Sequence, residues 1–374
     1  MNSLNQLIQC GQSYWLDNLT RAMIQNGALK KRVVEEGLRG VTSNPAIFNK
    51  AIAKSNDYDA QLKELARGEG PVEGACEQLV IKDIQDACDI LKPVFDASDG
   101  IDGFVSLEVS PYLAHETQGT MQEARRLFKA VNRPNVFIKI PGTQAGLQAI
   151  EQMLYEGVHV NITLLFSVER YEQVAEAYLA ALERRKAERK PLKNITSVAS
   201  FFLSRIDVLV DQLLLHRVSP GGTNNMAARG LLGKLAVANA KLAYRSFKKI
   251  FSGDRWRKLE DEGARVQRPL WASTSTKNPE YSDVCYVEPL VGPDTVNTMP
   301  EETIAAFADH GKVKENSIAD GGDQAVQVMR ELQRLGIDFS CVAWQLENEG
   351  VQKFIDPFAE LMRAIAEKRQ RLAS

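Results

Sequence analysis

The chain has 374 residues, enough to bury a large core, and its 46 basic and 48 acidic side chains give a formal net charge of −2. This balance argues against a nucleic-acid partner or an anionic membrane surface. The five cysteines form no CxxC and the four histidines form no HExxH or HxH, which disfavours a disulfide framework or a zinc site. With no signal-like N-terminus and no run near ~18 apolar residues, we expect a cytoplasmic protein without metal or cofactor.

Short β-rich runs alternate with amphipathic helical patterns along the chain. The predicted helices include residues 121–131, 167–189 and 204–216. The predicted strands are residues 12–17, 40–44, 103–110, 135–140, 158–166, 195–200, 269–275 and 284–291. Strands separated by helices predict parallel βαβ units, and about eight such units predict a closed (β/α)₈ TIM barrel of the α/β class. No GxGxxG or GxxxxGK[ST] follows any strand, so the sequence favours the closed barrel over an open doubly wound sheet.

The surplus length predicts additional helices around a single barrel domain that spans residues 1–374. Residues 252–267 are a strongly charged insertion, which we expect to be a solvated loop, and residues 219–225 also have loop composition. Helices are expected from about residue 301 to the end. The last of them is predicted over residues 357–370, with Asp356 as N-cap and Pro357 at the first helical position.

Polar residues stand where parallel strands should be apolar. Strands buried on both faces normally read as continuous apolar runs. In the third strand Ser106, Glu108 and Ser110 share one face, and in the fifth strand Asn161 and Thr163 alternate with apolar residues. The remaining polar residues near strand ends are Asp17, Thr42, Asn44, Lys139, Ser200 and Ser273. Since active sites of this fold lie at the C-terminal mouth, the pattern predicts the site there.

Each of these residues alone has an ordinary structural explanation. A lysine at a strand end, such as Lys139, usually extends to solvent, and Glu108 could be half of an ion pair. Asn44, before Pro45, could simply end a strand as a turn residue. Together on successive strand ends, however, they favour a catalytic constellation.

The side chains suggest imine chemistry. A lysine withdrawn from water can be neutral, and a neutral amine condenses with a ketone to form an imine, an electron sink for C–C cleavage. For Lys139, Glu108 on the neighbouring strand could transfer protons through a water held by Thr163. Asp17 could accept a hydroxyl proton during cleavage, and Asn44 could hydrogen-bond substrate hydroxyls. Asn161 is suited to the same task, and Thr42 belongs to the predicted substrate-binding set.

A phosphorylated substrate needs cations at the mouth. Arg205, five residues after Ser200, is predicted in the first turn after the sixth strand and can bind phosphate bidentately. Ser273 and Lys277 flank the end of the seventh strand, where this fold often binds phosphate. The alternative for Arg205 is a surface salt bridge.

Six segments support a family resemblance: GVTSNPAIF (40–48), DGFVSLEVSP (102–111), VFIKIPGT (136–143), HVNITLLFS (159–167), SVASFFLSRID (197–207) and WASTSTKNP (271–279). In these ordered segments the chain resembles transaldolases, specifically their longer bacterial branch. The resemblance implies a (β/α)₈ barrel that transfers a dihydroxyacetone unit between sugar phosphates in the pentose phosphate pathway. The donors would be sedoheptulose 7-phosphate or fructose 6-phosphate, and the acceptors glyceraldehyde 3-phosphate or erythrose 4-phosphate.

The resemblance also implies a role for each matching residue. Lys139 would form the Schiff base, Glu108 and Thr163 would manage the catalytic water, and Asp17 would be the acid/base of aldol cleavage. Asn44 and Asn161 would hold the dihydroxyacetone unit. The residues nearer the phosphate would be Ser200, Arg205 and Ser273.

One position departs from the family pattern. Many transaldolases have an arginine two residues after the position of Ser273, where this chain has Ser275. We expect Lys277, the nearest cation, to take its place, although a lysine is a point charge and not a planar fork.

Other functions remain open on the sequence. The nearest is a fructose-6-phosphate aldolase-type lyase that uses the same lysine and releases free dihydroxyacetone. A sugar-phosphate isomerase needs a base but no imine, and a non-catalytic sugar-phosphate binder has no need of a buried amine. The sequence leaves open a homodimer or a monomer.

Overall fold

A closed barrel of parallel strands forms the centre of the molecule. The computed structural model describes residues 2–66, 71–218 and 225–373. Each strand pairs with the next one along the chain, from β1 to β8, and β8 pairs with β1 to close the barrel. Their bounds are β1 (Gln12–Leu16), β2 (Gly40–Thr42), β3 (Phe104–Glu108), β4 (Val136–Pro141), β5 (Val160–Leu165), β6 (Ser197–Phe202), β7 (Arg268–Ala272) and β8 (Thr295–Met299). The predicted (β/α)₈ fold is therefore confirmed.

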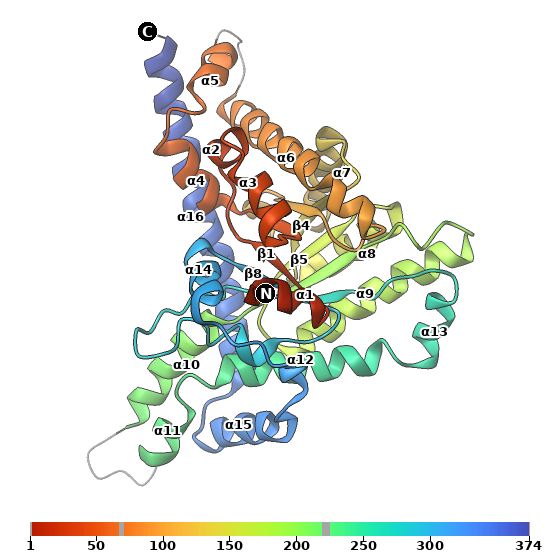
Figure 1. Ribbon diagram of the computed structural model, residues 1–374, viewed down its shortest axis with the longest axis vertical. Coiled ribbons are helices and arrows are strands. Elements are labelled where there is room, and N and C mark those ends of the chain that lie inside the picture. Colours follow the sequence, from red (N-terminus) through yellow and green to blue (C-terminus); the bar gives the residue numbers. More distant parts are fainter. Residues whose placement is uncertain (1, 67–70, 219–224, 374) are drawn as a thin grey trace.

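Helices surround the barrel and follow its strands (Figure 1). Those in the first half are α1 (Ser3–Gln9), α2 (Arg21–Gln25), α3 (Ala28–Lys31), the π-helix η1 (Arg32–Glu36), α4 (Pro45–Ala53), α5 (Asp59–Ala66), α6 (Val72–Ala97), the 3₁₀ helix η2 (Pro111–Leu113), α7 (Thr117–Val131) and α8 (Gln144–Glu156). Those in the second half are α9 (Val168–Ala187), α10 (Ser204–Arg217), α11 (Asn225–Leu231), α12 (Leu235–Ile250), α13 (Asp254–Glu260), the 3₁₀ helices η3 (Glu288–Leu290) and η4 (Ser317–Ala319), α14 (Glu301–His310), α15 (Gly322–Arg334) and α16 (Phe339–Ala373).

The helical patterns predicted after strands three, five and six are confirmed as α7, α9 and α10. The start of α9 has a clear physical cause. The Ser167 hydroxyl accepts a hydrogen bond from the Arg170 amide and caps the helix. The predicted loop over residues 219–225 lies almost wholly outside the described residues.

The predicted eighth strand is wrong. Residues 284–291 form a turn followed by η3, and the strand is instead Thr295–Met299. Their apolar side chains misled the prediction, because Val284, Val287 and Leu290 are buried although no strand carries them. Pro289, which lacks the N–H that a central strand needs, was the contrary signal.

Two expectations about the added segments also need correction. The charged segment 252–267 is not only a loop: it contains α13, whose Trp256 is 1% exposed against the body of the protein. The last helix does not begin at Asp356, because α16 starts at Phe339 and continues through Pro357. Burial on both sides of the proline, by Phe354 and Leu361, compensates for the backbone hydrogen bond that proline cannot make.

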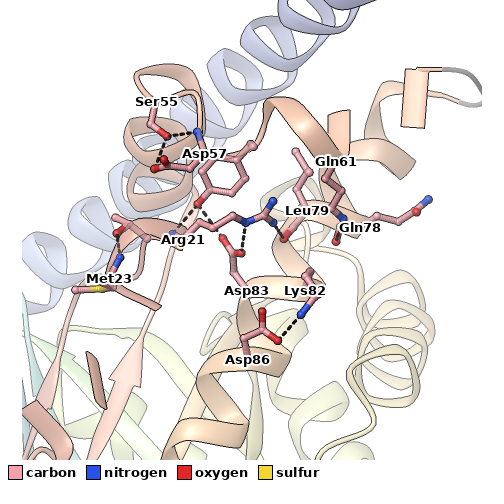
Figure 2. Close-up of polar contacts among 12 residues, drawn as sticks. Arg21, Met23, Ser55, Asp57, Gln61, Gln78, Leu79, Lys82, Asp83 and Asp86 are labelled. Atoms are coloured by element: carbon pink, nitrogen blue, oxygen red, sulfur yellow. Dashed lines mark hydrogen bonds and ion pairs between the residues drawn. The ribbon is translucent and has the colours of Figure 1, made fainter. Parts of the chain in front are cut away.

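The segment after β1 is tied to α6 by a buried ion pair. Arg21 donates from Nε to Asp83 Oδ1 at 2.8 Å and from Nη2 to the Leu79 carbonyl at 3.2 Å (Figure 2). The Tyr58 hydroxyl donates to the other Asp83 oxygen at 2.8 Å. The ion pair thereby holds α6 next to the segment that follows β1.

The described part of the chain has features that bear on membrane and metal binding. None of its helices is both long and apolar enough to cross a bilayer. Within residues 2–66, 71–218 and 225–373, no group of three or more His, Cys, Asp or Glu side chains has the arrangement of a metal site.

Candidate active site

Lys139 and Glu108 form a buried pair inside the barrel. Glu108 on β3 and Lys139 on β4 are direct register partners, so their side chains share the inner face. Lys139 Nζ lies 3.2 Å from Glu108 Oε2, and the two side chains are only 6% and 5% exposed. The amine also donates to the Ser43 carbonyl at 3.4 Å. Burial raises the pKa of Glu108, although the Lys139 charge opposes that rise.

Two polar atoms in and beside this pair make no hydrogen bond to the described residues. Glu108 Oε1 and the Thr163 hydroxyl are both buried without a hydrogen-bond partner among the described residues. Buried polar atoms are normally paired, so such orphans mark a place where a reacting group is expected to bind. No direct hydrogen bond joins Thr163 to Glu108 in the described chain, and their shared water remains a prediction.

Asp17 lies directly after β1 and is held by threonines. Its Oδ1 accepts a hydrogen bond from Thr42 Oγ1 at 2.6 Å, and Thr42 Oγ1 lies 2.7 Å from Thr298 Oγ1 on β8. Burial raises the pKa of Asp17, while the Thr42 hydrogen bond and the charge of Lys139 lower it. A carboxyl whose pKa is raised toward neutrality is suited to proton transfer.

Asn161 lies at the centre of a network that joins three strands. Its amide nitrogen donates to Ser106 Oγ at 3.0 Å, and its carbonyl oxygen accepts from Ser200 Oγ at 2.7 Å. Asn161 also pairs in register with Lys139, so the network fixes the amide beside the amine. Asn44 caps α4, because its oxygen accepts a hydrogen bond from the Ile47 amide at 3.0 Å, and a bond from its amide nitrogen to a ligand remains a prediction.

A cavity of about 260 Å³ opens at the C-terminal ends of the strands and collects most of the predicted residues. The predicted residues that line it are Asp17, Thr42, Asn44, Lys139, Ser200, Arg205, Ser273 and Lys277. Glu108, Asn161 and Thr163 are not in its lining; the first contacts Lys139 and the second Ser200, both of which do line it. The C-terminal mouth that the strand pattern predicted is thus where the structure brings these residues together.

Arg205 is an unpaired cation in this cavity. It lies in the first turn of α10, as predicted, and none of the described carboxylates lies within ion-pair distance of it. Its Nη1 is buried without a hydrogen-bond partner, and burial lowers its pKa. The alternative of a surface salt bridge is therefore wrong, and a guanidinium in this state is suited to bind an anionic group.

The end of β7 forms the other side of the same region. Ser273 adopts the left-handed backbone conformation, with φ of 55°, and its hydroxyl lies 2.8 Å from that of Ser204. A non-glycine residue held in that conformation is a strained feature that clusters at functional sites. Lys277 is exposed at the rim of the cavity, where its amine contacts the Ser275 hydroxyl.

Several lining residues were absent from the prediction. Thr298 was missed because the eighth strand was misassigned, and Phe202 because an aromatic residue on a buried strand gives no functional signal. Glu302 lies in α14, directly after the misassigned eighth strand, whereas Phe354 comes from α16, which lies far along the chain from the strand ends that it approaches. No local pattern in the sequence identifies them.

Comparisons with known proteins show the family of this chain. The family model for transaldolase/fructose-6-phosphate aldolase matches residues 14–365. The chain is 48% identical over 373 residues to "Transaldolase 2" of Nostoc sp. (strain PCC 7120), covering 98% of each chain. It is also 48% identical over 361 residues to the "Transaldolase" of Mycolicibacterium paratuberculosis, covering 96% of this chain and 95% of that protein. The chain belongs to the transaldolase/fructose-6-phosphate aldolase family.

Proposed function

We propose that the protein is a transaldolase that transfers a dihydroxyacetone unit from a ketose phosphate to an aldose phosphate through a Schiff base on Lys139. The observation that carries this proposal is the buried Lys139–Glu108 pair, 3.2 Å apart, in one site with Asp17 and an unpaired Arg205. A site that only bound sugar phosphates would gain nothing from burying an amine at high desolvation cost.

The first step is formation of the imine. The Lys139 amine attacks the C2 carbonyl of the ketose and loses a proton, and the resulting carbinolamine loses its C2 hydroxyl as water to leave the C=N bond. Glu108 is suited to act as the acid in this step, because it is close enough to Lys139 to deliver the proton that the departing hydroxyl needs. Its raised pKa favours the protonated acid that this delivery requires.

The second step is cleavage of the C3–C4 bond. Asp17 takes the proton of the C4 hydroxyl, the C4 oxygen becomes the aldehyde of the departing aldose phosphate, and the bonding electrons move into the imine to give an enamine. The contact with Thr42 orients the Asp17 carboxylate for this transfer. Asn44 and Asn161 are suited to hydrogen-bond the hydroxyls of the retained three-carbon unit.

The third step reverses the second with a new aldehyde. The enamine carbon attacks the acceptor, Asp17 returns the proton to the new hydroxyl, and water releases the ketose phosphate from Lys139. Arg205, with Ser273 and Lys277 at the rim, is suited to bind the phosphate of donor and acceptor. We propose that Lys277 supplies the charge that an arginine supplies in many relatives.

The substrates proposed are sedoheptulose 7-phosphate or fructose 6-phosphate as donors, and glyceraldehyde 3-phosphate or erythrose 4-phosphate as acceptors. The relatives named transaldolase support this choice. These metabolites belong to the pentose phosphate pathway and the cytoplasm, where we propose that the enzyme acts, as one domain over residues 1–374. The homodimer and the monomer are equally compatible with this mechanism.

The test is a transfer assay with fructose 6-phosphate and erythrose 4-phosphate. We expect sedoheptulose 7-phosphate and glyceraldehyde 3-phosphate to appear in equal amounts, each matching the donor consumed. Omission of erythrose 4-phosphate should stop donor consumption after about one equivalent per active site. Steady release of free dihydroxyacetone without acceptor, at the rate of donor consumption, would identify the lyase instead.

A further inference from the structure

The C-terminal helix reaches the catalytic cavity from the far end of the chain. Figure 1 shows α16 as the long blue helix that runs past α4 toward the C-terminus. Along this path it passes so close to the end of β5 that a Cβ atom on Gly350 would lie 2.9 Å from Leu164 Cδ2. The same atom would lie 3.6 Å from Arg205 Nη1. A glycine at this position therefore allows the helix to approach the barrel mouth closely.

Phe354, one helical turn after Gly350, inserts its ring into the cavity lining. The residue is 4% exposed, and its ring centroid lies 5.1 Å from Lys139 Nζ. Arg205 Cζ lies 5.8 Å from the same centroid, and the Phe202 ring is 6.3 Å away in an edge-on arrangement. One ring thus contacts both the amine that forms the imine and the guanidinium proposed for phosphate.

Contacts on both sides of Phe354 hold α16 in place. Before it, Glu347 forms an ion pair with Arg170 of α9 at 3.3 Å, with side chains 16% and 20% exposed. After it, Asn49 of α4 donates to Glu360 at 2.9 Å. α16 cannot move away from the cavity without breaking contacts to two different helices.

We propose that Phe354 is a positioning residue that keeps water from the Lys139 enamine and thereby decides between transfer and release. The inference rests on the proposed function. Release of free dihydroxyacetone requires protonation of the enamine carbon, then addition of water to the imine carbon and departure of the Lys139 amine. Transfer requires that the acceptor aldehyde bond to that carbon first, and water enters only afterwards to release the new ketose phosphate from Lys139. A packed ring over Lys139 excludes water that would carry a proton to the enamine carbon before the acceptor binds, and so leaves the acceptor as the first reaction partner of that carbon.

The experiment measures the ratio of free dihydroxyacetone to transferred product with fructose 6-phosphate and erythrose 4-phosphate. We expect Phe354→Ala to raise this ratio by about tenfold, the effect of 1.4 kcal/mol in relative barriers. Because the ratio is a property of each turnover, loss of folded enzyme does not change it. The KM for the phosphorylated donor should also rise, by about three- to tenfold, because Arg205 loses a cation–π contact.

Two further variants make the test specific. Phe354→Leu retains apolar bulk over Lys139, so we expect a ratio near that of the wild type together with the raised KM. Phe358→Ala removes a ring one turn further along α16, where it packs on Tyr112 with a centroid distance of 5.7 Å, and should leave both quantities unchanged.

Three results would overturn the inference while the proposed function stands. They are an unchanged ratio in Phe354→Ala, an equal rise in Phe358→Ala, or a Phe354→Leu ratio as high as that of the alanine variant. In each case borohydride would still trap substrate on Lys139. Failure of trapping in the wild-type enzyme would instead remove the proposed function itself.

Discussion

Two buried ion pairs with similar exposure have very different surroundings. In the barrel, Lys139 and Glu108 are 6% and 5% exposed and 3.2 Å apart. In the outer layer, Arg21 and Asp83 are 8% and 1% exposed and 2.8 Å apart. Burial alone therefore does not separate the pair proposed for catalysis from the structural one.

Hydrogen bonding and access do separate them. Both Asp83 oxygens accept hydrogen bonds, and Arg21 also binds the Leu79 carbonyl and lies over the Tyr58 ring at 4.2 Å (Figure 2). Around Glu108, in contrast, Oε1 has no partner among the described residues, and the amine beside it lines a cavity.

The difference shows how a buried pair can serve stability or chemistry. A buried charge is costly unless its hydrogen bonds are complete, and the Arg21–Asp83 pair meets that condition. The Lys139–Glu108 pair retains unsatisfied capacity where a substrate would complete it, which is the condition expected of catalytic groups.

The largest expected effect concerns Lys139. Lys139→Ala should abolish turnover while the fold remains intact, because Lys277, the other described lysine that lines the cavity, lies exposed at its rim. Steady-state transfer kinetics and thermal unfolding would check both statements. Turnover close to that of the wild type would remove Lys139 from the mechanism.

Glu108→Ala should slow turnover by roughly 10²–10⁴, the usual contribution of a positioned acid/base group. Single-turnover kinetics should place the loss in carbinolamine dehydration. The matched variant Glu108→Gln keeps the shape and should be slowed as well, since an amide cannot deliver the proton. If Glu108→Gln were as fast as the wild type, proton transfer by this residue would be refuted.

Asp83→Ala should lower the free energy of unfolding by about 3–5 kcal/mol, because it leaves the Arg21 charge buried and unpaired. The kcat per folded enzyme should stay within a few fold of the wild type. Denaturant unfolding gives the measurement. Asp89→Ala, which breaks an exposed pair with Arg133, is the control and should cost about 0–1 kcal/mol. Equal losses in the two variants would contradict the distinction.

Arg205→Met should raise the KM for phosphorylated donors about 10–100-fold, the effect of losing a charged hydrogen bond. The kcat should change less, because the contact is proposed in both the bound substrate and the transition state. A kcat loss with unchanged KM would show that Arg205 acts in the chemical step.

The smallest effect is a displacement of the acid limb of kcat/KM. Asp17 must be ionised to accept a proton, so activity falls as pH falls through its pKa. Burial raises that pKa, which places the limb above the usual value of about 4. The Arg205 charge opposes this rise in the Asp17 pKa, so Arg205→Met should move the acid limb to higher pH.

Lys277→Met is the control. The Lys277 charge is not among the causes of the Asp17 shift, so this variant should leave the acid limb in place. A shift toward lower pH in Arg205→Met would contradict the electrostatic account.

Much of this arrangement could be predicted from sequence because strand geometry is regular. Period-two alternation correctly placed Glu108, Lys139 and Asn161 on one inner face, and the structure pairs them in register on β3, β4 and β5. Seven of the strands were located for the same reason, and only their ends differ, as in β7, which ends at Ala272 and not at residue 275.

The remaining features depend on tertiary contacts. The polar β8 was hidden because its residues, including Thr298, form hydrogen bonds inside a closed barrel that no local pattern encodes. The length of α16 and the position of Phe354 were also unpredictable, since burial of distant side chains carries the helix through Pro357. Completeness of hydrogen bonding, which separates the two ion pairs, is likewise visible only in three dimensions.

Reductive trapping tests the central claim most directly. The enzyme is incubated with fructose 6-phosphate, treated with borohydride, digested and mapped by mass spectrometry. The account predicts one modified peptide, with a reduced three-carbon or six-carbon adduct on Lys139, and complete loss of activity. Full activity after treatment, or an adduct on any lysine other than Lys139, would contradict it.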